Sequence, residues 1–264
     1  MEPLTLSDPA DPRLDPFREL PARERATDDV VAESELAVSR WLASPHPVRA
    51  VLTTPERWPR LASLVGPEVA VFLAPIALIR EVVGFPLRRG AVAWGPRPQP
   101  PGERRPGPHR AVVAVGLSDP RNLGALIRNA RAFGVDEVVV TPGGADPFSR
   151  RAIRAAAGHG FELALRVEPI EHTLARLADA LWIATSPRGA SRLDALDPGP
   201  RWALVVGNEG AGLSPEVLAR CGAQVRIPLA PGVDSLNVAA ATAICLHALC
   251  PSPETTLGPS LSCG

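Results

Sequence analysis

Apolar residues in the first 95 positions of the chain form short continuous runs that alternate with segments in which they recur at helical spacing. Short apolar runs are typical of buried strands, and recurrence near every third or fourth position is typical of a helix with one buried face. The pattern predicts strands over 48–53, 68–73 and 90–94 and helices over 28–43, 58–64 and 76–83. Residues 1–25 are rich in Pro, Asp and Arg and predict an extended arm with one short helix. The alternation indicates an N-terminal α/β domain over residues 1–95.

Residues 96–109 interrupt this pattern with a segment dominated by proline and glycine. Proline lacks the N–H that a helix or a sheet ladder needs, so neither element is expected to continue through the segment. We predict a linker of stiff polyproline character here, and we place the domain boundary in it.

From residue 110 to residue 250, apolar strands again alternate with amphipathic helices. Strands are predicted over 110–117, 137–141, 181–185, 203–207 and 224–227, and helices over 122–133, 150–157, 173–180, 238–249 and a short segment from Ser214. The run 202–206 contains no polar residue, as expected for a strand buried on both faces of a parallel sheet. The predicted fold class is therefore α/β, with a parallel sheet in the C-terminal domain. Residues 251–264 are expected to be a disordered tail.

Composition narrows the possible functions. The 264 residues carry 28 basic and 28 acidic side chains, every basic one an arginine, and this balance argues against non-specific coating of nucleic acid. The four cysteines form no C-x-x-C pair and have no histidine at zinc-ligand spacing, which favours free thiols over a metal site. No apolar run is long enough to span a bilayer, and the N-terminus does not resemble a signal peptide, so we expect a cytoplasmic protein.

Three segments of the second domain carry candidate chemistry, and the first is 119–128. It follows a buried strand and opens a helix, and polar side chains at such a position face the crevice where α/β sheets bind ligands. Asn122 and Arg128 are six residues apart and lie on nearby faces of that helix. The alternative for this segment is a capped helix with a solvated arginine.

The second segment, 204–213, places three glycines within six residues directly after a buried strand. Such a loop allows a ligand or another backbone to approach closely. The glycine order matches neither the dinucleotide fingerprint nor the phosphate-cradling Walker loop. Glu209 in this loop is either an acid of the site or a surface charge.

The third segment, 227–238, runs from a strand through a Pro/Gly loop to the start of a long helix. Ser235 is a candidate N-cap of that helix. A sharper hypothesis is that the backbone groups of this loop hold a small molecule at the helix N-terminus.

Together, and in this order, the three segments resemble the motifs of the SpoU/TrmH family of RNA 2'-O-methyltransferases. The resemblance covers residues 110–250 and rests on N-L-G-x-x-x-R from Asn122, G-N-E-G-x-G-L from Gly207, and I-P from Ile227 followed by S-L-N-V from Ser235. It implies a parallel sheet with a deep trefoil knot, a rare exception to the usual rules of topology. It also implies a homodimer with the active site near the subunit interface.

The resemblance implies that S-adenosylmethionine is the cofactor and that no metal is required. The cofactor would be held in the knot by five residues, namely Gly207, Asn208, Gly210, Ile227 and Leu236. The implied catalytic residues are Asn122, Arg128, Glu209, Ser235 and Asn237. Because the pKa of a guanidinium is above about 12, Arg128 is a poor base, and we expect it to clamp an RNA phosphate.

The implied substrate is RNA, with ribosomal RNA favoured over transfer RNA because of the N-terminal domain. The opening of that domain, Val30 to Ser34, resembles the small RNA-binding domain of many members, although a glycine is usual where Ser34 stands. Two further departures are Ala156 and Ala239, at positions where serine is frequent in the family. Neither removes a candidate catalytic residue.

Three arginines on one predicted helix, Arg150, Arg151 and Arg154, are either an RNA-backbone contact or a solvated helix face. Two other function classes stay open at this stage. One is a non-catalytic RNA-binding protein that kept the fold, and the other is an unrelated nucleotide-binding α/β enzyme.

Overall fold

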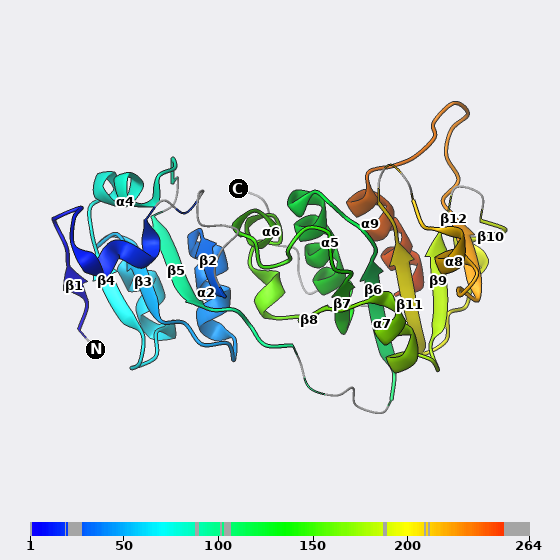
Figure 1. Ribbon diagram of the computed structural model, residues 1–264, viewed down its shortest axis with the longest axis horizontal. Coiled ribbons are helices and arrows are strands. Elements are labelled where there is room, and N and C mark those ends of the chain that lie inside the picture. The colour runs from blue at the N-terminus through cyan, green and yellow to red at the C-terminus, as the bar shows by residue number, and fades with distance from the viewer. Residues whose placement is uncertain are drawn as a thin grey trace, which may run out of the picture.

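A computed structural model of the protein describes residues 2–18, 20, 28–87, 90–100, 102, 107–186, 189–208, 210 and 212–250. Two α/β units lie beside each other along its longest axis, the N-terminal one drawn in blue and cyan in Figure 1. The predicted tail, 251–264, lies outside the described residues, as does Glu209.

The N-terminal unit contains a mixed sheet of five strands. Its elements are β1 Leu4–Thr5, η1 Pro12–Phe17, β2 Asp29–Glu33, α2 Glu35–Ala43, β3 Ala50–Thr53, α3 Trp58–Leu61, η2 Ala62–Leu64, β4 Ala70–Leu73, α4 Ile76–Val83 and β5 Ala91–Pro96. The strand order is β1-β4-β3-β5-β2. Strands β1, β4 and β3 are parallel, whereas β5 runs antiparallel to β3 and to β2. The short arm strand β1 completes one edge of this sheet.

The single helix predicted over 28–43 is wrong, because the segment is a strand, β2, followed by a helix, α2. Val30 and Ala32 are buried on one face of β2, and β-branched residues such as Val30 and Val31 favour a pleated strand. Ser34 separates the two elements with φ 87° and ψ 144°, a backbone conformation that is easy only for glycine. Its hydroxyl accepts a hydrogen bond from the Ala37 N–H and so caps α2.

The C-terminal unit is a seven-stranded sheet in which every pairing is parallel. Its elements are β6 His109–Ala114, α5 Pro120–Ala132, β7 Glu137–Val140, α6 Arg150–Ala155, η3 His159–Phe161, β8 Ala164–Val167, α7 Ile170–Arg176, β9 Leu181–Thr185, β10 Ser191–Arg192, η4 Leu193–Ala195, β11 Arg201–Val206, α8 Pro215–Leu218, β12 Ala223–Arg226 and α9 Val238–Leu249. The order is β10-β12-β9-β11-β6-β7-β8. The predicted parallel α/β sheet is confirmed.

The strand order reverses between β6 and β11. From β6 the chain moves outward through β7 and β8, whereas β9, β11 and β12 lie on the other side. Ligands of open α/β sheets bind at such a switch point, beyond the carboxyl ends of the strands. Residues 227–237 then return the chain from β12 to α9, which packs against α5. The knot implied by the resemblance would lie in this return and stays a prediction.

The two units share one hydrophobic core. Trp41 of α2 stacks on Phe161 of η3 with ring centroids 4.5 Å apart and planes within 6° of parallel. Gly158 lies so close to Ala37 that a Cβ built at residue 158 would be 2.7 Å from the Ala37 Cα. The units are therefore docked through packed side chains as well as joined by residues 97–108.

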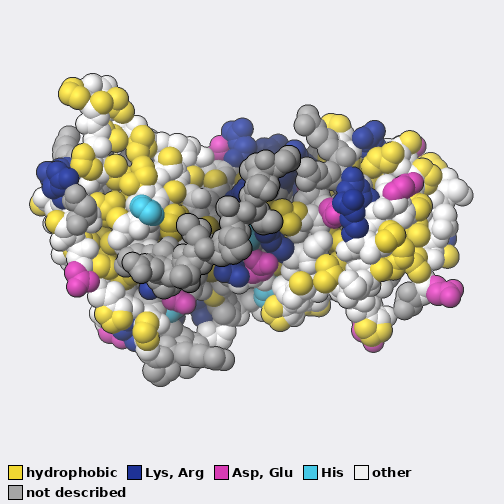
Figure 2. All heavy atoms as spheres, turned by 180° about the vertical axis from the view of Figure 1, so that it is seen from behind, with side chains coloured by type: hydrophobic (Ala, Val, Ile, Leu, Met, Phe, Trp, Pro, Cys, Tyr) yellow, Lys and Arg dark blue, Asp and Glu magenta, His cyan; other side chains and the backbone are white. Residues whose placement is uncertain are grey.

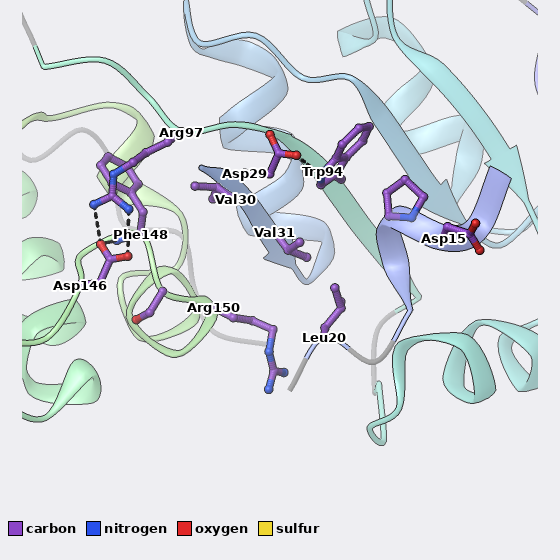
Figure 3. A pocket seen from close by; sticks show the side chains of 12 residues that line it. Asp15, Leu20, Asp29, Val30, Val31, Trp94, Arg97, Asp146, Phe148 and Arg150 are labelled. Carbon is purple, nitrogen blue, oxygen red and sulfur yellow. Dashed lines mark hydrogen bonds and ion pairs between the residues drawn. The ribbon is translucent and has the colours of Figure 1, made fainter. Parts of the chain in front are cut away.

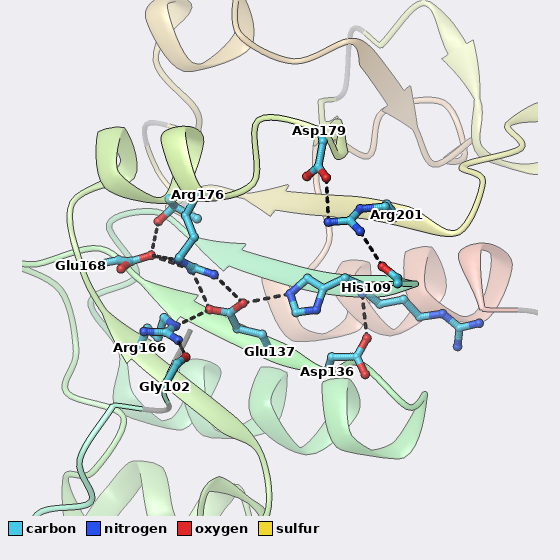
Figure 4. Close-up of polar contacts among 12 residues, drawn as sticks. Gly102, His109, Asp136, Glu137, Arg166, Glu168, Arg176, Asp179 and Arg201 are labelled. Atoms are coloured by element: carbon cyan, nitrogen blue, oxygen red, sulfur yellow. Dashed lines mark hydrogen bonds and ion pairs between the residues drawn. The ribbon is translucent and has the colours of Figure 1, made fainter. Parts of the chain in front are cut away.

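A buried group of charged residues lies at the amino edge of the parallel sheet, where β6, β7 and β8 begin (Figure 4). Glu137 is 2 % exposed, and its carboxylate lies 2.8 Å from Arg166 Nε, 2.6 Å from Arg176 Nη2 and 3.0 Å from His109 Nε2. Arg166 also donates to the carbonyl of Gly102, and Arg201 donates to that of Gly107 at 2.6 Å. These bonds hold described residues of the connecting segment against the sheet.

Burial alone would raise the pKa of Glu137. The hydrogen bonds from His109 and Arg176, with the charges of Arg176 and Arg166, outweigh burial and hold this pKa below its ordinary value. The buried carboxylate is therefore ionised at neutral pH.

Candidate active site

A cavity of about 590 Å³ opens at the carboxyl edge of the parallel sheet, beyond β9, β11 and β12. It is bounded by the ends of these strands, by the loop 207–213 and by the segment 227–238. All five predicted cofactor residues line it, namely Gly207, Asn208, Gly210, Ile227 and Leu236. Ser235, predicted to be catalytic, lines it as well.

The glycine loop is closed by its own backbone. A Cβ built at Gly207 would lie 2.6 Å from the carbonyl carbon of Gly212, so no other residue fits there without moving the loop. The Gly212 N–H donates to the Asn208 carbonyl at 2.9 Å, and the Gly210 N–H donates to the Asn208 side-chain oxygen at 2.8 Å. The Asn208 amide donates in turn to the Gly116 carbonyl at 2.9 Å, which ties this loop to the turn after β6.

The third predicted segment reaches the same cavity from the other side. Leu236 is 37 % exposed, which leaves its apolar side chain available to a ligand. Asn237 ends the segment and caps α9, with its side-chain oxygen accepting from the N–H groups of Ala239 at 2.9 Å and Ala240 at 3.4 Å. The predicted cap at Ser235 is therefore wrong, and Asn237 caps the helix two residues later.

The structure brings the first and third predicted segments together. The side-chain amide of Asn237 donates to the side-chain oxygen of Asn122 at 2.9 Å, although 115 residues separate them. A second bond joins the same helices: Asn129, seven residues after Asn122 on α5, donates to the Ala239 carbonyl at 2.8 Å. Two hydrogen bonds thus fix α9 against α5.

Arg128 lies on α5, exposed and outside the lining of the cavity. Among the described residues it makes no hydrogen bond or ion pair. Of the five predicted catalytic residues, the structure therefore joins Asn122 with Asn237, places Ser235 in the cavity and leaves Arg128 on the surface.

Helix α5 begins with Asp119 as its N-cap and Pro120 in its first turn. Asp119 accepts from the Arg121 N–H at 2.8 Å and forms an ion pair with its guanidinium at 2.9 Å, and these bonds hold the pKa of Asp119 below its ordinary value.

Gly124, the glycine of the first motif, has a packing role that the sequence interpretation did not assign. A Cβ at Gly124 would lie 2.3 Å from the Ala152 carbonyl oxygen, so glycine is what lets α5 and α6 approach. A glycine within an amphipathic helix pattern is the signal that could have indicated this contact.

The arginines of α6 have partners in the other unit. Glu33 of β2, only 3 % exposed, accepts from Arg150 at 2.7 Å and from Arg154 at 3.1 Å. The Arg150 guanidinium also lies over the Phe85 ring, 4.2 Å from its centroid. Arg150 is therefore held within the protein and is neither a solvated side chain nor available to contact RNA. Arg151 and Arg154 stay exposed on the surface. Figure 2 shows arginine side chains gathered over the middle of the molecule, where the two units meet.

The described cysteines, Cys221, Cys245 and Cys250, are free thiols. Burial raises the pKa of Cys245 to about 12 and that of Cys221 to about 11, so neither is a ready nucleophile or metal ligand. Within the described ranges, no three His, Cys, Asp or Glu side chains converge as a metal site would require. No helix in that part of the chain has both the length and the apolar character needed to span a bilayer.

A parallel sheet with a glycine loop and a capped helix start around a cavity at its carboxyl edge defines an α/β enzyme that binds a small organic cofactor. The model of the SpoU rRNA methylase family matches residues 109–247, and the chain belongs to that family. The family predicted from the three motifs is confirmed.

Relatives and solved structures agree with this assignment. An uncharacterized tRNA/rRNA methyltransferase of Mycobacterium tuberculosis is 36% identical over 91% of this chain and 89% of its own length. The 23S rRNA (guanosine(2553)-2'-O)-methyltransferase of Bacillus subtilis is 31% identical over 56% of this chain and 61% of its own. The crystal structure of an RNA 2'-O ribose methyltransferase superposes with a TM-score of 0.77, at 26% identity over 94% of this chain and 97% of that one.

An AdoMet-bound rRNA methyltransferase from Sinorhizobium meliloti has the same fold, with a TM-score of 0.81 at 24% identity over 93% of this chain and 97% of that one.

Proposed function

We propose that this protein transfers the methyl group of S-adenosylmethionine to a ribose 2'-oxygen of RNA. The observation that carries the proposal is the convergence of the second and third motifs on one cavity at the carboxyl edge of the sheet, with Asn237 of the third motif bonded to Asn122 of the first. Three segments that are far apart in the sequence thus form one continuous site.

The residues of the cavity fit the cofactor. Its walls combine apolar side chains such as Val206 and Leu236, suited to an adenine ring, with the backbone groups of the glycine loop. Asp234 and Ser235 add side-chain oxygens that accept hydrogen bonds from an ammonium or a ribose hydroxyl. When bound, the cofactor supplies a methyl group on a sulfonium that is already activated for transfer.

The task left to the protein is to hold the ribose in line with the methyl group and to help the 2'-hydroxyl lose its proton. Asn122 and Asn237 are positioned by their mutual hydrogen bond to orient the ribose. Arg128 is exposed on α5 and offers its guanidinium to an RNA phosphate, which can then accept the proton directly or through water. Glu209, in the glycine loop, is proposed to orient Arg128.

We also propose that the protein works as a homodimer formed through its C-terminal unit. Ile244 on α9 is 42 % exposed, and Leu229, Val233 and Leu236 in the segment before that helix are 36 %, 49 % and 37 % exposed. Apolar side chains of this size on adjoining segments are typical of a protein–protein contact. A second copy of the chain covering them would also enclose the cavity.

Ribosomal RNA is the favoured substrate, with transfer RNA second. Relatives that are matched over about half of the chain include methyltransferases of 23S rRNA, whereas the relative matched over most of it is described for tRNA and rRNA alike. Arg151 and Arg154 are proposed to contact the RNA backbone beside the site. We also propose, as the sequence predicts, that the protein acts in the cytoplasm.

Transfer of radiolabelled methyl groups to purified ribosomal and transfer RNA pools, followed by nucleoside analysis, tests the proposal. We expect a 2'-O-methylated nucleoside in ribosomal RNA and loss of transfer in Arg128→Ala, with cofactor binding retained. Failure of the wild-type protein to bind S-adenosylmethionine or to methylate either pool would contradict it.

A further inference from the structure

A second cavity, of about 360 Å³, lies where the two units meet. Strands β2 and β5 and the helix η1 form one part of it, and residues 146–150 of the C-terminal unit form the other (Figure 3). Val31 lines it on the face of β2 that carries Trp94, its cross-strand partner in β5, and Val30 lines it from the opposite face of the strand, on the side of Phe148. Its size, near the lower end of the range for small-molecule sites, suits a single nucleotide rather than a helix.

Charged side chains of both signs lie beside these apolar residues. Asp29 accepts from Trp94 Nε1 at 3.2 Å and from Arg49 at 3.0 Å, and only 28 % of its side chain is exposed. Arg97 makes two parallel bonds to Asp146, at 2.9 and 2.7 Å, and its guanidinium lies 5.0 Å from the centre of the Phe148 ring. A carboxylate only accepts hydrogen bonds, whereas a guanidinium pairs with phosphate, so the two kinds of group suit the two ends of a nucleotide.

The loop 141–149, which supplies one wall of the second cavity, is tied to the turn that also holds the glycine loop of the first. Asn208 bonds to the Gly116 carbonyl, and the Gly116 N–H donates to Thr141 Oγ1 at 3.0 Å. Further along the loop, the Ala145 N–H donates to the Leu117 carbonyl at 2.6 Å. Because this loop follows the carboxyl end of β7, both cavities lie toward the same edge of the parallel sheet.

We propose that the cavity at the junction binds one unpaired nucleotide of the substrate RNA, away from the methylated ribose. The base would lie against Val31 and Trp94, with its amino group donating to Asp29, and Arg97 would pair with its phosphate. Unstacked bases in single-stranded RNA are recognised in this way, by aromatic side chains and by hydrogen bonds to their edges. The inference rests on the proposed function, since it assigns a further contact to the same substrate.

Filling the cavity tests the proposal. Val31→Trp adds an indole inside the cavity, beside Trp94, and Ala43→Trp adds the same group to a separate cavity that is lined by Ala43 and also by Phe148, which makes it a matched control. The probe is a short fluorescein-labelled single-stranded RNA of mixed sequence. Because stacking of one base on an aromatic side chain raises affinity by roughly tenfold or more, we expect Val31→Trp to weaken binding roughly tenfold and Ala43→Trp to change it less than about twofold.

Asp29→Asn provides a second variant that preserves the size of the side chain. It replaces one acceptor oxygen with a donor, so competition by guanosine and cytidine monophosphates should weaken relative to uridine monophosphate. Wild-type RNA affinity in Val31→Trp, with circular dichroism and S-adenosylmethionine binding unchanged, would overturn the assignment of this cavity while leaving the proposed function intact. Absence of RNA binding and methyl transfer in the wild-type protein would instead remove the proposed function, and this inference with it.

Discussion

The two edges of the parallel sheet are built in opposite ways. At the carboxyl edge, glycines, backbone hydrogen bonds and partly exposed apolar side chains surround an open cavity. At the amino edge, a carboxylate that is 2 % exposed is paired with two arginines and a histidine, and the space is filled. The strands between them are common to both. The comparison indicates that the carboxyl edge leaves room for a ligand around the glycine loop, whereas the paired charges around Glu137 contribute stability.

Replacing Glu137 with glutamine should produce the largest effect. It would leave Arg166 without its carboxylate partner and Arg176 with Glu168 alone, and breaking a buried ion pair typically costs about 3–5 kcal/mol. We expect the free energy of unfolding, measured with urea, to fall by that order. Any folded variant should bind S-adenosylmethionine normally, and weakened binding without loss of stability would break the distinction between the edges.

The contribution of Glu137 should also depend on pH. Its pKa is held below the ordinary value, so its stabilising effect is present above the pKa of the unfolded carboxyl, about 4.3, and is lost as the pH falls through the lower, folded value. The stability difference between wild type and Glu137→Gln should therefore shrink below about pH 4. Urea unfolding at a series of pH values would measure it, and a constant difference would contradict an ionised Glu137.

Replacing Gly207 with valine tests the opposite edge. The side chain would collide with the backbone of Gly212 and Leu213 and displace the loop that lines the cavity. We expect S-adenosylmethionine to bind at least about a hundredfold more weakly, a loss of about 2.7 kcal/mol, in isothermal titration calorimetry. Gly66→Ala is the control, because a Cβ there would meet nothing within 4 Å. Normal cofactor binding in Gly207→Val would place the cofactor elsewhere.

Asn237→Ala should affect both stability and catalysis, because Asn237 caps α9 and also bonds to Asn122. Loss of an N-cap costs about 0.5–2 kcal/mol. Asn122→Ala breaks the same side-chain bond but leaves the cap, so it should lower the rate of methyl transfer with a smaller loss of stability. Urea unfolding and single-turnover transfer on the two variants would separate the roles, and equal stability losses would refute the assignment.

Ser34→Gly should give the smallest change, in the direction of greater stability. Glycine adopts the backbone conformation of residue 34 without strain, and an N-cap glycine is only a few tenths of a kcal/mol poorer than serine. We expect a gain of about 1 kcal/mol in the free energy of unfolding and no change at either edge of the sheet. Ser34→Ala, which loses the cap and keeps the strain, should be less stable than wild type.

Local patterns in the sequence were sufficient for much of the fold. The predicted bounds of α4, β9 and α9 agree with the structure, because α4 has a clear apolar period, β9 is a short apolar run and α9 is a long Ala-rich segment. Strand β2 is hard to predict because it has only five residues and a single residue, Ser34, separates it from α2, so the helical spacing of α2 hides it. Strand β8 was missed because alternating Ala, Leu, Arg and Val gives only a weak signal.

The candidate site likewise has parts that the sequence predicts and parts that only the tertiary structure reveals. The residues that line the cavity could be predicted because they lie in compact motifs at the ends of strands. The partner of Arg150 could not, since Glu33 is 117 residues away and only the packing of the two units brings them together. The bond between Asn122 and Asn237 is likewise a result of tertiary structure.

The stacking of Trp41 on Phe161, with the ion pairs of Glu33 nearby, has a consequence for how such proteins diverge. A proline-rich segment between two domains would allow one RNA-binding domain to be replaced by another if the domains were independent of each other. Here an incoming module would have to supply an aromatic ring and a buried acid at matching places. We therefore expect the two units to be inherited together, with substitutions at this junction occurring in compensating pairs across it rather than singly.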